Sequence, residues 1–292
     1  MGNRKFKFID LFAGIGGFHI AMSNLGGDCV FASEIDQYAR KTYLHNFNID
    51  KEKFNEDITK MNIKNIPDFD ILCAGFPCQP FSQAGKKRGF SDHRGNLFFN
   101  ISDIIDKKKP KAFFLENVRG IKTHDDGNTF ATIKDIIENQ LGYSFYSKII
   151  KASDFGLPQL RPRTFMIGFK NDKNKNFEFP QALEKLKYSM SDVLNGKCSR
   201  EIGFTLRVGG RGSKITDRRN WDSYFVDGKV IRIGPKEGLK MQGFPDHFDM
   251  PVSQTQAMKQ LGNSVAVDAI QSVSKNIIKY IKKNELFSSS YM

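Results

Sequence analysis

The sequence has little that would build a disulfide or metal framework. Its 292 residues include only four cysteines, and no two of them form a Cys-x-x-Cys pair. This excludes a disulfide-stapled secreted fold and disfavours a cysteine zinc site, so we expect no metal. The chain also lacks an apolar run near the roughly 20 residues of a membrane span, and no signal-peptide stretch precedes Asp10. We therefore expect a protein of the reducing cytoplasm with no membrane partner.

Acidic residues are in deficit. The chain has 45 Lys and Arg against 32 Asp and Glu, which gives a net charge of +13. The excess is larger in residues 170–292, with 21 basic and 13 acidic residues, than in residues 1–169, with 24 and 19. Such a balance favours a polyanionic partner such as nucleic acid. Charge alone is equally compatible with an ordinary basic protein.

Short apolar runs alternate with helical segments over residues 1–170. The runs predict strands at Lys7–Phe12, Cys29–Ser33, Asp70–Ala74 and Ala112–Leu115. Helices are expected between them at His19–Asn24, Asp36–Asn46, Asn96–Lys107 and Thr129–Asn139. Apolar strands separated by helices predict an α/β fold with a doubly wound, mostly parallel sheet.

The composition changes after residue 170. A polar connection is followed by a stretch rich in Gly, Arg and β-formers, with a hairpin turn expected at Asp227-Gly228. Near the end, Val265–Lys283 predicts an amphipathic helix. We expect a catalytic and cofactor-binding domain, a small β-rich domain and a C-terminal return to the first domain, at residues 1–170, 171–231 and 232–292 respectively.

The first expected strand runs into the glycine-rich turn DLFAGIGGF, which contains Gly14 and Gly16. Glycines there let the backbone approach a ligand at the carboxyl end of the strand. His19 stands where a dinucleotide fingerprint has its third glycine, so pyrophosphate binding is poorly matched. Glu34 lies 20 residues beyond Gly14, where a carboxylate holds ribose hydroxyls. This favours an adenosyl ligand without phosphates, such as S-adenosylmethionine, over a nicotinamide dinucleotide; an ordinary tight turn is the alternative.

The third strand runs into GFPCQPFS, residues 75–82, in which prolines on both sides of Cys78 restrict the loop. A free thiol is only a few per cent thiolate at neutral pH, so a nucleophilic cysteine needs assistance. The nearest basic candidates are Lys86, Lys87 and Arg88. A buried structural cysteine is the alternative; it suits Cys73, inside the strand, better than Cys78.

Glu116 follows the fourth strand in FFLENV. The carboxyl ends of parallel strands meet at one sheet edge, so Glu116 is expected near Gly14 and Cys78. A desolvated carboxyl there can stay protonated and donate to a ring nitrogen. A strand-end glutamate that meets solvent or caps a helix is the alternative.

Together these motifs resemble those of the DNA (cytosine-5)-methyltransferases of bacterial restriction–modification systems. The resemblance covers nearly the whole chain. It rests on FIDLFAGIGGF (8–18), GFPCQPFS (75–82), RGNLFF (94–99), ENV (116–118), QLRPR (159–163) and QLGNSV (260–265). It implies a Rossmann-like methyltransferase fold that uses S-adenosylmethionine and leaves S-adenosylhomocysteine, with residues 171–231 as the target-recognition domain.

The resemblance also implies a covalent mechanism on a cytosine flipped out of the duplex. Cys78 would add to C6, C5 would take the methyl group, and loss of the C5 proton would release Cys78. Glu116 would engage N3 and the exocyclic amine, and Arg163 would contact O2. Arg161 would support this catalytic set.

Further residues follow from the resemblance. It implies that the following residues bind the cofactor: Phe12, Gly14, Gly16, Glu34, Ile35, Asp57, Ile58, Leu97, Asn263 and Val265. Ile35 stands where many relatives have an aromatic residue. Contacts to DNA are expected from Thr205, Arg207, Gly209, Gly210 and Arg211. The segment Ser82–Arg94 resembles a loop that closes over DNA.

The expected partner is double-stranded DNA, with a restriction endonuclease as a functional pair, and the chain is expected to be a monomer. Two alternatives stay open: the same chemistry on transfer RNA, and a non-catalytic DNA-binding module. The basic Gly/Arg stretch and Gly75-Phe76 favour DNA, whereas the shortness of that stretch speaks for RNA. The presence of Cys78 and Glu116 disfavours the non-catalytic module.

Overall fold

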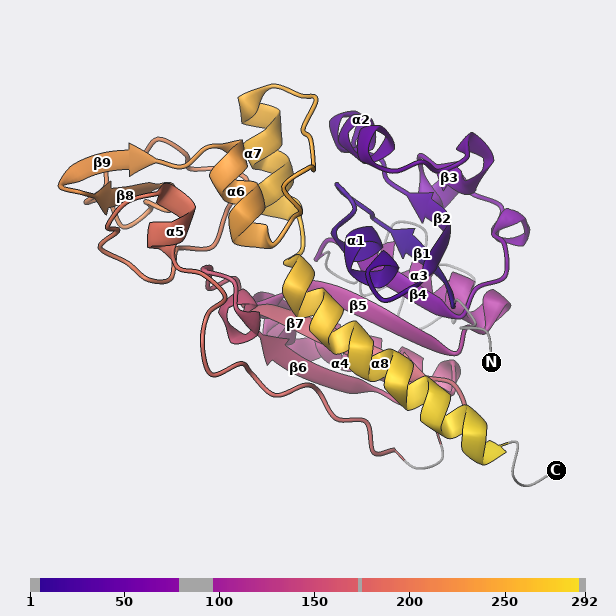
Figure 1. The fold of residues 1–292 in the computed structure, drawn as a ribbon. Coiled ribbons are helices and arrows are strands. Elements are labelled where there is room, and N and C mark those ends of the chain that lie inside the picture. The colour runs from indigo at the N-terminus through magenta and orange to yellow at the C-terminus, as the bar shows by residue number, and fades with distance from the viewer. Residues whose placement is uncertain (1–5, 79–96, 173–174, 289–292) are drawn as a thin grey trace.

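The computed structural model describes residues 6–78, 97–172 and 175–288 of the chain (Figure 1). The expected closing loop Ser82–Arg94, with its Lys86, Lys87 and Arg88, lies outside the described residues, as does the cysteine motif beyond Cys78. Within the described part, no helix is long and apolar enough to cross a membrane. No group of three or more His, Cys, Asp or Glu side chains in these ranges is placed to hold a metal ion.

One seven-stranded sheet organises the fold, in the order β3-β2-β1-β4-β5-β7-β6. Its strands are β1 (Lys7–Leu11), β2 (Asp28–Ser33), β3 (Phe54–Asn55), β4 (Ile71–Gly75), β5 (Ala112–Val118), β6 (Tyr146–Ile150) and β7 (Arg163–Phe169). Strand β1 pairs in parallel with β2 and β4, and β4 with β5, whereas β7 is antiparallel to β5 and β6. The expected α/β fold with a mostly parallel sheet is confirmed.

Helices cover both faces of this sheet. They are α1 (Gly17–Ser23), α2 (Gln37–Asn46), α3 (Leu97–Lys108), α4 (Asn128–Asp135) and α8 (Val267–Ser288). Successive strand side chains point to opposite faces. Phe8 therefore joins the buried cluster that includes α1 and α8, while Ile9 joins the one that includes α3 and α4. The C-terminal α8 lies along the sheet in Figure 1 and packs against α1 near the other end of the sequence.

The remaining α-helices and strands form a smaller group beside the sheet (Figure 1). They are α5 (Met190–Leu194), β8 (Ser223–Val226), β9 (Lys229–Arg232), α6 (Pro235–Gln242) and α7 (Gln254–Asn263). Strands β8 and β9 form an antiparallel hairpin, and both turn residues, Asp227 (φ 48°) and Gly228 (φ 76°), have positive φ. This is the hairpin turn expected from the sequence. In the described part of residues 171–231, the named strands are confined to this hairpin, so regular β structure is sparser than the composition suggested.

A continuous buried cluster links the two parts of the molecule. It runs from Phe8 in the sheet through Phe155 to Trp221 and Met241. The smaller group is therefore packed on the sheet through apolar side chains. The division at residues 170 and 231 remains a prediction.

Candidate active site

A cavity of about 690 Å³ opens where β1, β2, β4 and β5 end. Its size lies within the usual range for small-molecule sites, about 300–1,000 Å³. Its place follows from the fold, because ligands of open parallel sheets bind at the carboxyl ends of the strands. Thirteen of the residues expected from the sequence line it: Phe12, Gly14, Glu34, Ile35, Asp57, Ile58, Cys78, Leu97, Glu116, Arg163, Thr205, Arg207 and Asn263.

The turn after β1 brings backbone and carboxylate together at the cavity. Gly14 has φ 57°, and a Cβ there would meet no atom within 4 Å, so the cavity reaches the backbone itself. Its N–H donates to Glu34 Oε2 at 2.8 Å, and the N–H of Asp36 donates to Oε1 at 2.7 Å. Each carboxylate oxygen keeps a lone pair for a ligand hydroxyl. Burial raises the pKa of Glu34, and the two N–H bonds oppose the rise.

Phe12 also lines the cavity and has φ 55°, a left-handed conformation that is rare for a bulky residue. Such strain is held by surrounding structure and is concentrated at functional sites. At the mouth, the Ile35 residue is 67% exposed, which leaves an apolar surface free for a ring to cover.

One carboxylate oxygen of Asp57 already accepts hydrogen bonds within its own turn. Its Oδ1 accepts from the N–H and the hydroxyl of Thr59, and these bonds lower the pKa of its carboxyl. Its Oδ2 pairs with Lys60 at 3.3 Å. Asp57 thus presents an ionised, acceptor-only group at the cavity wall, next to the buried Ile58.

Two expected cofactor residues lie behind the cavity wall. Gly16 has φ 88°, and a Cβ there would lie 2.1 Å from the Phe47 ring, so this glycine permits close packing of the turn on Phe47. Val265 is buried against Gly17 and Gly75, where its methyl groups fill the space of absent side chains. Neither residue is part of the cavity lining, and both shape it from behind; their place at the cofactor stays a prediction.

Strand register brings Cys78 and Glu116 to the same edge. Gly75, the last residue of β4, pairs with Glu116 in β5, and a Cβ on Gly75 would lie 3.7 Å from Glu116 Oε2. The side-chain amide of Asn117 donates to the carbonyl of Phe76 at 2.9 Å, which fixes the chain two residues before Cys78. Burial raises the pKa of the Cys78 thiol. The basic residues expected to assist it lie outside the described part.

Glu116 and Arg163 form the most enclosed ion pair of the cavity. Arg163 Nε lies 2.9 Å from Glu116 Oε1, and their side chains are 15% and 10% exposed. Antiparallel pairing sets Arg163, the first residue of β7, beside the end of β5. Burial raises the pKa of Glu116, although Arg163 and Arg161 oppose the rise. A glutamate in this setting holds its proton to higher pH than a solvated one.

Arg161, expected among the catalytic residues, does not line the cavity. It is 2% exposed and donates to the carbonyls of Leu206, Gly262 and Ser264. The backbone N–H of Arg161 donates to Thr205 Oγ1 at 3.1 Å. The guanidinium satisfies carbonyls around the end of α7 and joins that helix to the 205–206 segment. Its expected support of the catalytic set stays a prediction, and these contacts fit a positioning role.

The structure shows two contacts between α7 and α2 that sequence patterns do not indicate. Lys259 Nζ on α7 lies 3.3 Å from Asp36 Oδ2 at the start of α2, and both residues line the cavity. Further along α2, the Thr42 hydroxyl donates to Gln260 Oε1 at 2.9 Å in a buried site. These contacts tie the smaller group to the cofactor side. No local signal marks them, because the partners are more than 200 residues apart.

The expected DNA-binding residues extend from the cavity to the surface. Thr205 and Arg207 line the cavity edge. Gly209 and Gly210 are exposed, and the Gly209 carbonyl accepts from the Trp221 indole at 2.9 Å. Arg211 turns toward a second, separate pocket. The segment thus lies between the two cavities and exposes its backbone at the glycines.

Comparison with known proteins agrees with this geometry. The family model described as C-5 cytosine-specific DNA methylase matches residues 6–207 and 199–279. The Type II methyltransferase M.HhaI of Haemophilus parahaemolyticus is 40% identical, over 93% of this chain and 94% of that protein. M.HpaII of Haemophilus parainfluenzae is 43% identical, over 94% and 90%. A similar fold occurs in a mutant of Spodoptera frugiperda DNMT2, with a TM-score of 0.70, 21% identity and coverage of 94% and 100%.

Proposed function

The chain belongs to the C-5 cytosine-specific DNA methylase family, and on that premise we propose how its residues methylate C5 of cytosine in DNA. The observation that carries the proposal is the convergence of Cys78, Glu116 and Arg163 on the cavity that Gly14 and Glu34 also line. A nucleophile, an acid and an adenosyl site in one cavity match the needs of this reaction.

Cys78 is the nucleophile. Its thiolate adds to C6 of the cytosine, and the electron pair of the C5–C6 double bond moves toward C5. Protonated Glu116 donates to N3 and accepts from the exocyclic amine, which favours addition, while Arg163 binds O2. The nucleophilic C5 takes the methyl group, the C5 proton is lost to a base, and elimination returns the electron pair to sulfur. The support for these roles is the enclosed Glu116–Arg163 pair and the raised pKa of Glu116.

S-adenosylmethionine supplies an electrophilic methyl group when bound. The residues present fit its adenosyl part. Glu34 has a free lone pair on each oxygen for ribose hydroxyls, and Gly14 leaves room for close approach. We assign the adenine surroundings to Phe12, Ile35, Asp57 and Ile58, and the remaining walls to Leu97 and Asn263.

The target cytosine must leave the base stack to enter the cavity. Thr205, Arg207, Gly209, Gly210 and Arg211 would hold the duplex beside it. The relatives are named Type II methyltransferases, which supports a role in restriction–modification with a paired endonuclease. One active site suffices for the reaction, so we propose that a monomer acts.

Methyl transfer from labelled S-adenosylmethionine tests this function. Unmethylated genomic DNA and transfer RNA are assayed side by side, and the DNA product is sequenced after bisulfite treatment. Label in DNA, at cytosines within one short motif, is the expected result. Label in RNA alone would overturn the assignment of DNA as substrate, and bound cofactor without transfer would overturn catalysis.

A further inference from the structure

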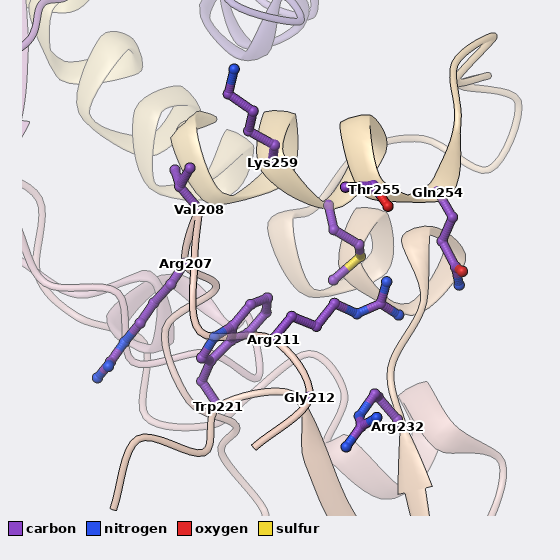
Figure 2. A pocket seen from close by; sticks show the side chains of 10 residues that line it. Arg207, Val208, Arg211, Gly212, Trp221, Arg232, Gln254, Thr255 and Lys259 are labelled. Atoms are coloured by element: carbon purple, nitrogen blue, oxygen red, sulfur yellow. The ribbon is translucent and has the colours of Figure 1, made fainter.

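A second pocket of about 480 Å³ lies beside the catalytic cavity and shares Arg207, Val208 and Lys259 with it. Figure 2 shows the Arg211 side chain reaching toward the start of α7, where Gln254 lies, with Arg232 lower in the view. Its lining includes four cationic side chains and no carboxylate. We call it the arginine pocket.

One buried carboxylate holds both arginines. Asp222 is fully buried, and its Oδ2 lies 3.5 Å from Arg211 Nε and 3.2 Å from Arg232 Nε. The N–H of Gly212 donates to the same oxygen at 3.2 Å. A single negative charge balances only one of the two guanidinium charges. The cluster therefore retains a positive charge that an anion can neutralise.

The free donors point to the same kind of ligand. Arg211 Nη2 donates to the carbonyl of Ile233 at 3.0 Å, and Arg232 Nη2 to that of Ser213 at 3.4 Å. Within the described ranges, neither arginine uses its Nη1 group in a hydrogen bond. Two fixed guanidiniums, each with donors to spare, fit the oxygens of a phosphate. The start of α7 adds the positive end of a helix dipole.

A base is a poorer fit than a phosphate. The aromatic residue in the lining, Trp221, is 1% exposed, and its indole N–H is bonded to Gly209. Its ring therefore gives no face on which a base could stack. The other apolar side chains in the lining, Val208 and Met258, are not aromatic and offer no ring for stacking.

We propose that the arginine pocket binds a backbone phosphodiester of the DNA duplex next to the flipped cytosine, through Arg211 and Arg232 held in place by Asp222. This rests on the proposed function, because the pocket adjoins the catalytic cavity and takes its ligand from the same substrate. Arg211 then positions the duplex and does not read a base.

The salt dependence of DNA binding tests the assignment, because each phosphate contact contributes about 0.9 to the slope of log K against log salt. The ligand is a fluorescent duplex of mixed sequence, and binding is followed by anisotropy. For Arg232→Gln and Arg211→Gln we expect slopes that are each smaller by about 0.9. Arg232→Lys keeps the charge and should keep most of the slope. Lys279→Ala, which removes an exposed charge on α8, is the matched control and should leave the slope unchanged.

Three outcomes would overturn the proposal. Equal slopes for the wild type, Arg232→Gln and Lys279→Ala would show that Arg232 makes no phosphate contact. Equal effects of Lys and Gln at position 232, with a lower melting temperature, would make Arg232 a structural tether only. Loss of affinity confined to duplexes that carry the methylated motif would make the arginines base readers. Failure of the wild-type protein to bind any duplex would instead count against the proposed function itself.

Discussion

Arg163 Nε and Glu116 Oε1 lie 2.9 Å apart at the edge of the sheet where β5 ends and β7 begins. The antiparallel pairing of these strands produces the contact. It places a guanidinium beside a carboxyl whose pKa burial has raised. Arg163 therefore offers hydrogen-bond donors, and Glu116 a carboxyl that can carry a proton, to the same heterocycle. This is the arrangement on which the proposed activation of cytosine depends.

Replacement of Cys78 by serine should abolish methyl transfer. A hydroxyl has a far higher pKa than a thiol and is a much weaker nucleophile toward C6. Binding of S-adenosylmethionine, measured by calorimetry, should stay close to the wild-type value, because the change keeps the size of the side chain. Cys198→Ser, in the smaller group, is the control and should retain transfer. Full turnover by Cys78→Ser would contradict the nucleophile assignment.

The Glu116→Gln variant should be strongly impaired, and its pH profile should differ from that of the wild type. Deprotonation of Glu116 lowers the rate as pH rises through its raised pKa, while ionisation of Cys78 raises the rate with pH. In the wild type the two effects oppose each other. In Glu116→Gln only the thiol titrates, so the residual single-turnover rate should climb by about tenfold per pH unit below the thiol pKa. Parallel profiles for the two proteins would show that Glu116 is not the titrating acid.

The Glu34→Gln variant should bind S-adenosylmethionine about tenfold more weakly, a loss of about 1.4 kcal/mol. The amide NH₂ would face the N–H of Gly14 or Asp36, which both need an acceptor. Calorimetric titration measures the effect. Glu56→Gln is the control, since Glu56 lines the same cavity but is 71% exposed in its ion pair with Arg40. Similar losses in both variants would indicate a general charge effect.

The Arg161→Met variant should lower the free energy of unfolding by about 3 kcal/mol, because it leaves the carbonyls of Leu206, Gly262 and Ser264 without their donor. Denaturant titration gives the value. The exposed Arg219, which pairs with Asp217, provides the control Arg219→Met, with a change within about 0.5 kcal/mol. An unchanged stability in Arg161→Met would mean that Arg161 does not hold these segments together.

The parallel half of the fold was predictable from sequence. The strands at Lys7–Leu11, Asp28–Ser33 and Ile71–Gly75 are mostly apolar runs, because both their faces are largely buried. The convergence of Cys78 and Glu116 follows once these strands are parallel. Strand β7, which is not among the expected strands, carries an apolar run of the same kind, TFMIGF, whereas the partly exposed β6 gives a weaker pattern.

The rest depends on contacts that no local pattern encodes. Arg161 looks like a neighbour of Arg163 in QLRPR, but with φ 32° its side chain enters the core while Arg163 reaches the cavity. The Lys259–Asp36 contact joins residues 223 positions apart. Gly16 and Val265 belong to the expected motifs, yet neighbouring side chains place them behind the wall. A motif identifies such residues without showing which of them touches the ligand.

Trapping of the covalent intermediate tests the central claim most directly. A duplex carries 5-fluorocytosine at the methylated position found by sequencing, and it is incubated with the enzyme and S-adenosylmethionine. Fluorine cannot leave C5 as a cation, so elimination of Cys78 is blocked after methyl transfer. We predict a denaturation-resistant complex with the mass of protein, DNA and one methyl group, linked at Cys78 in peptide maps. Methylation of ordinary DNA without such a complex, or a link at another residue, would contradict the account.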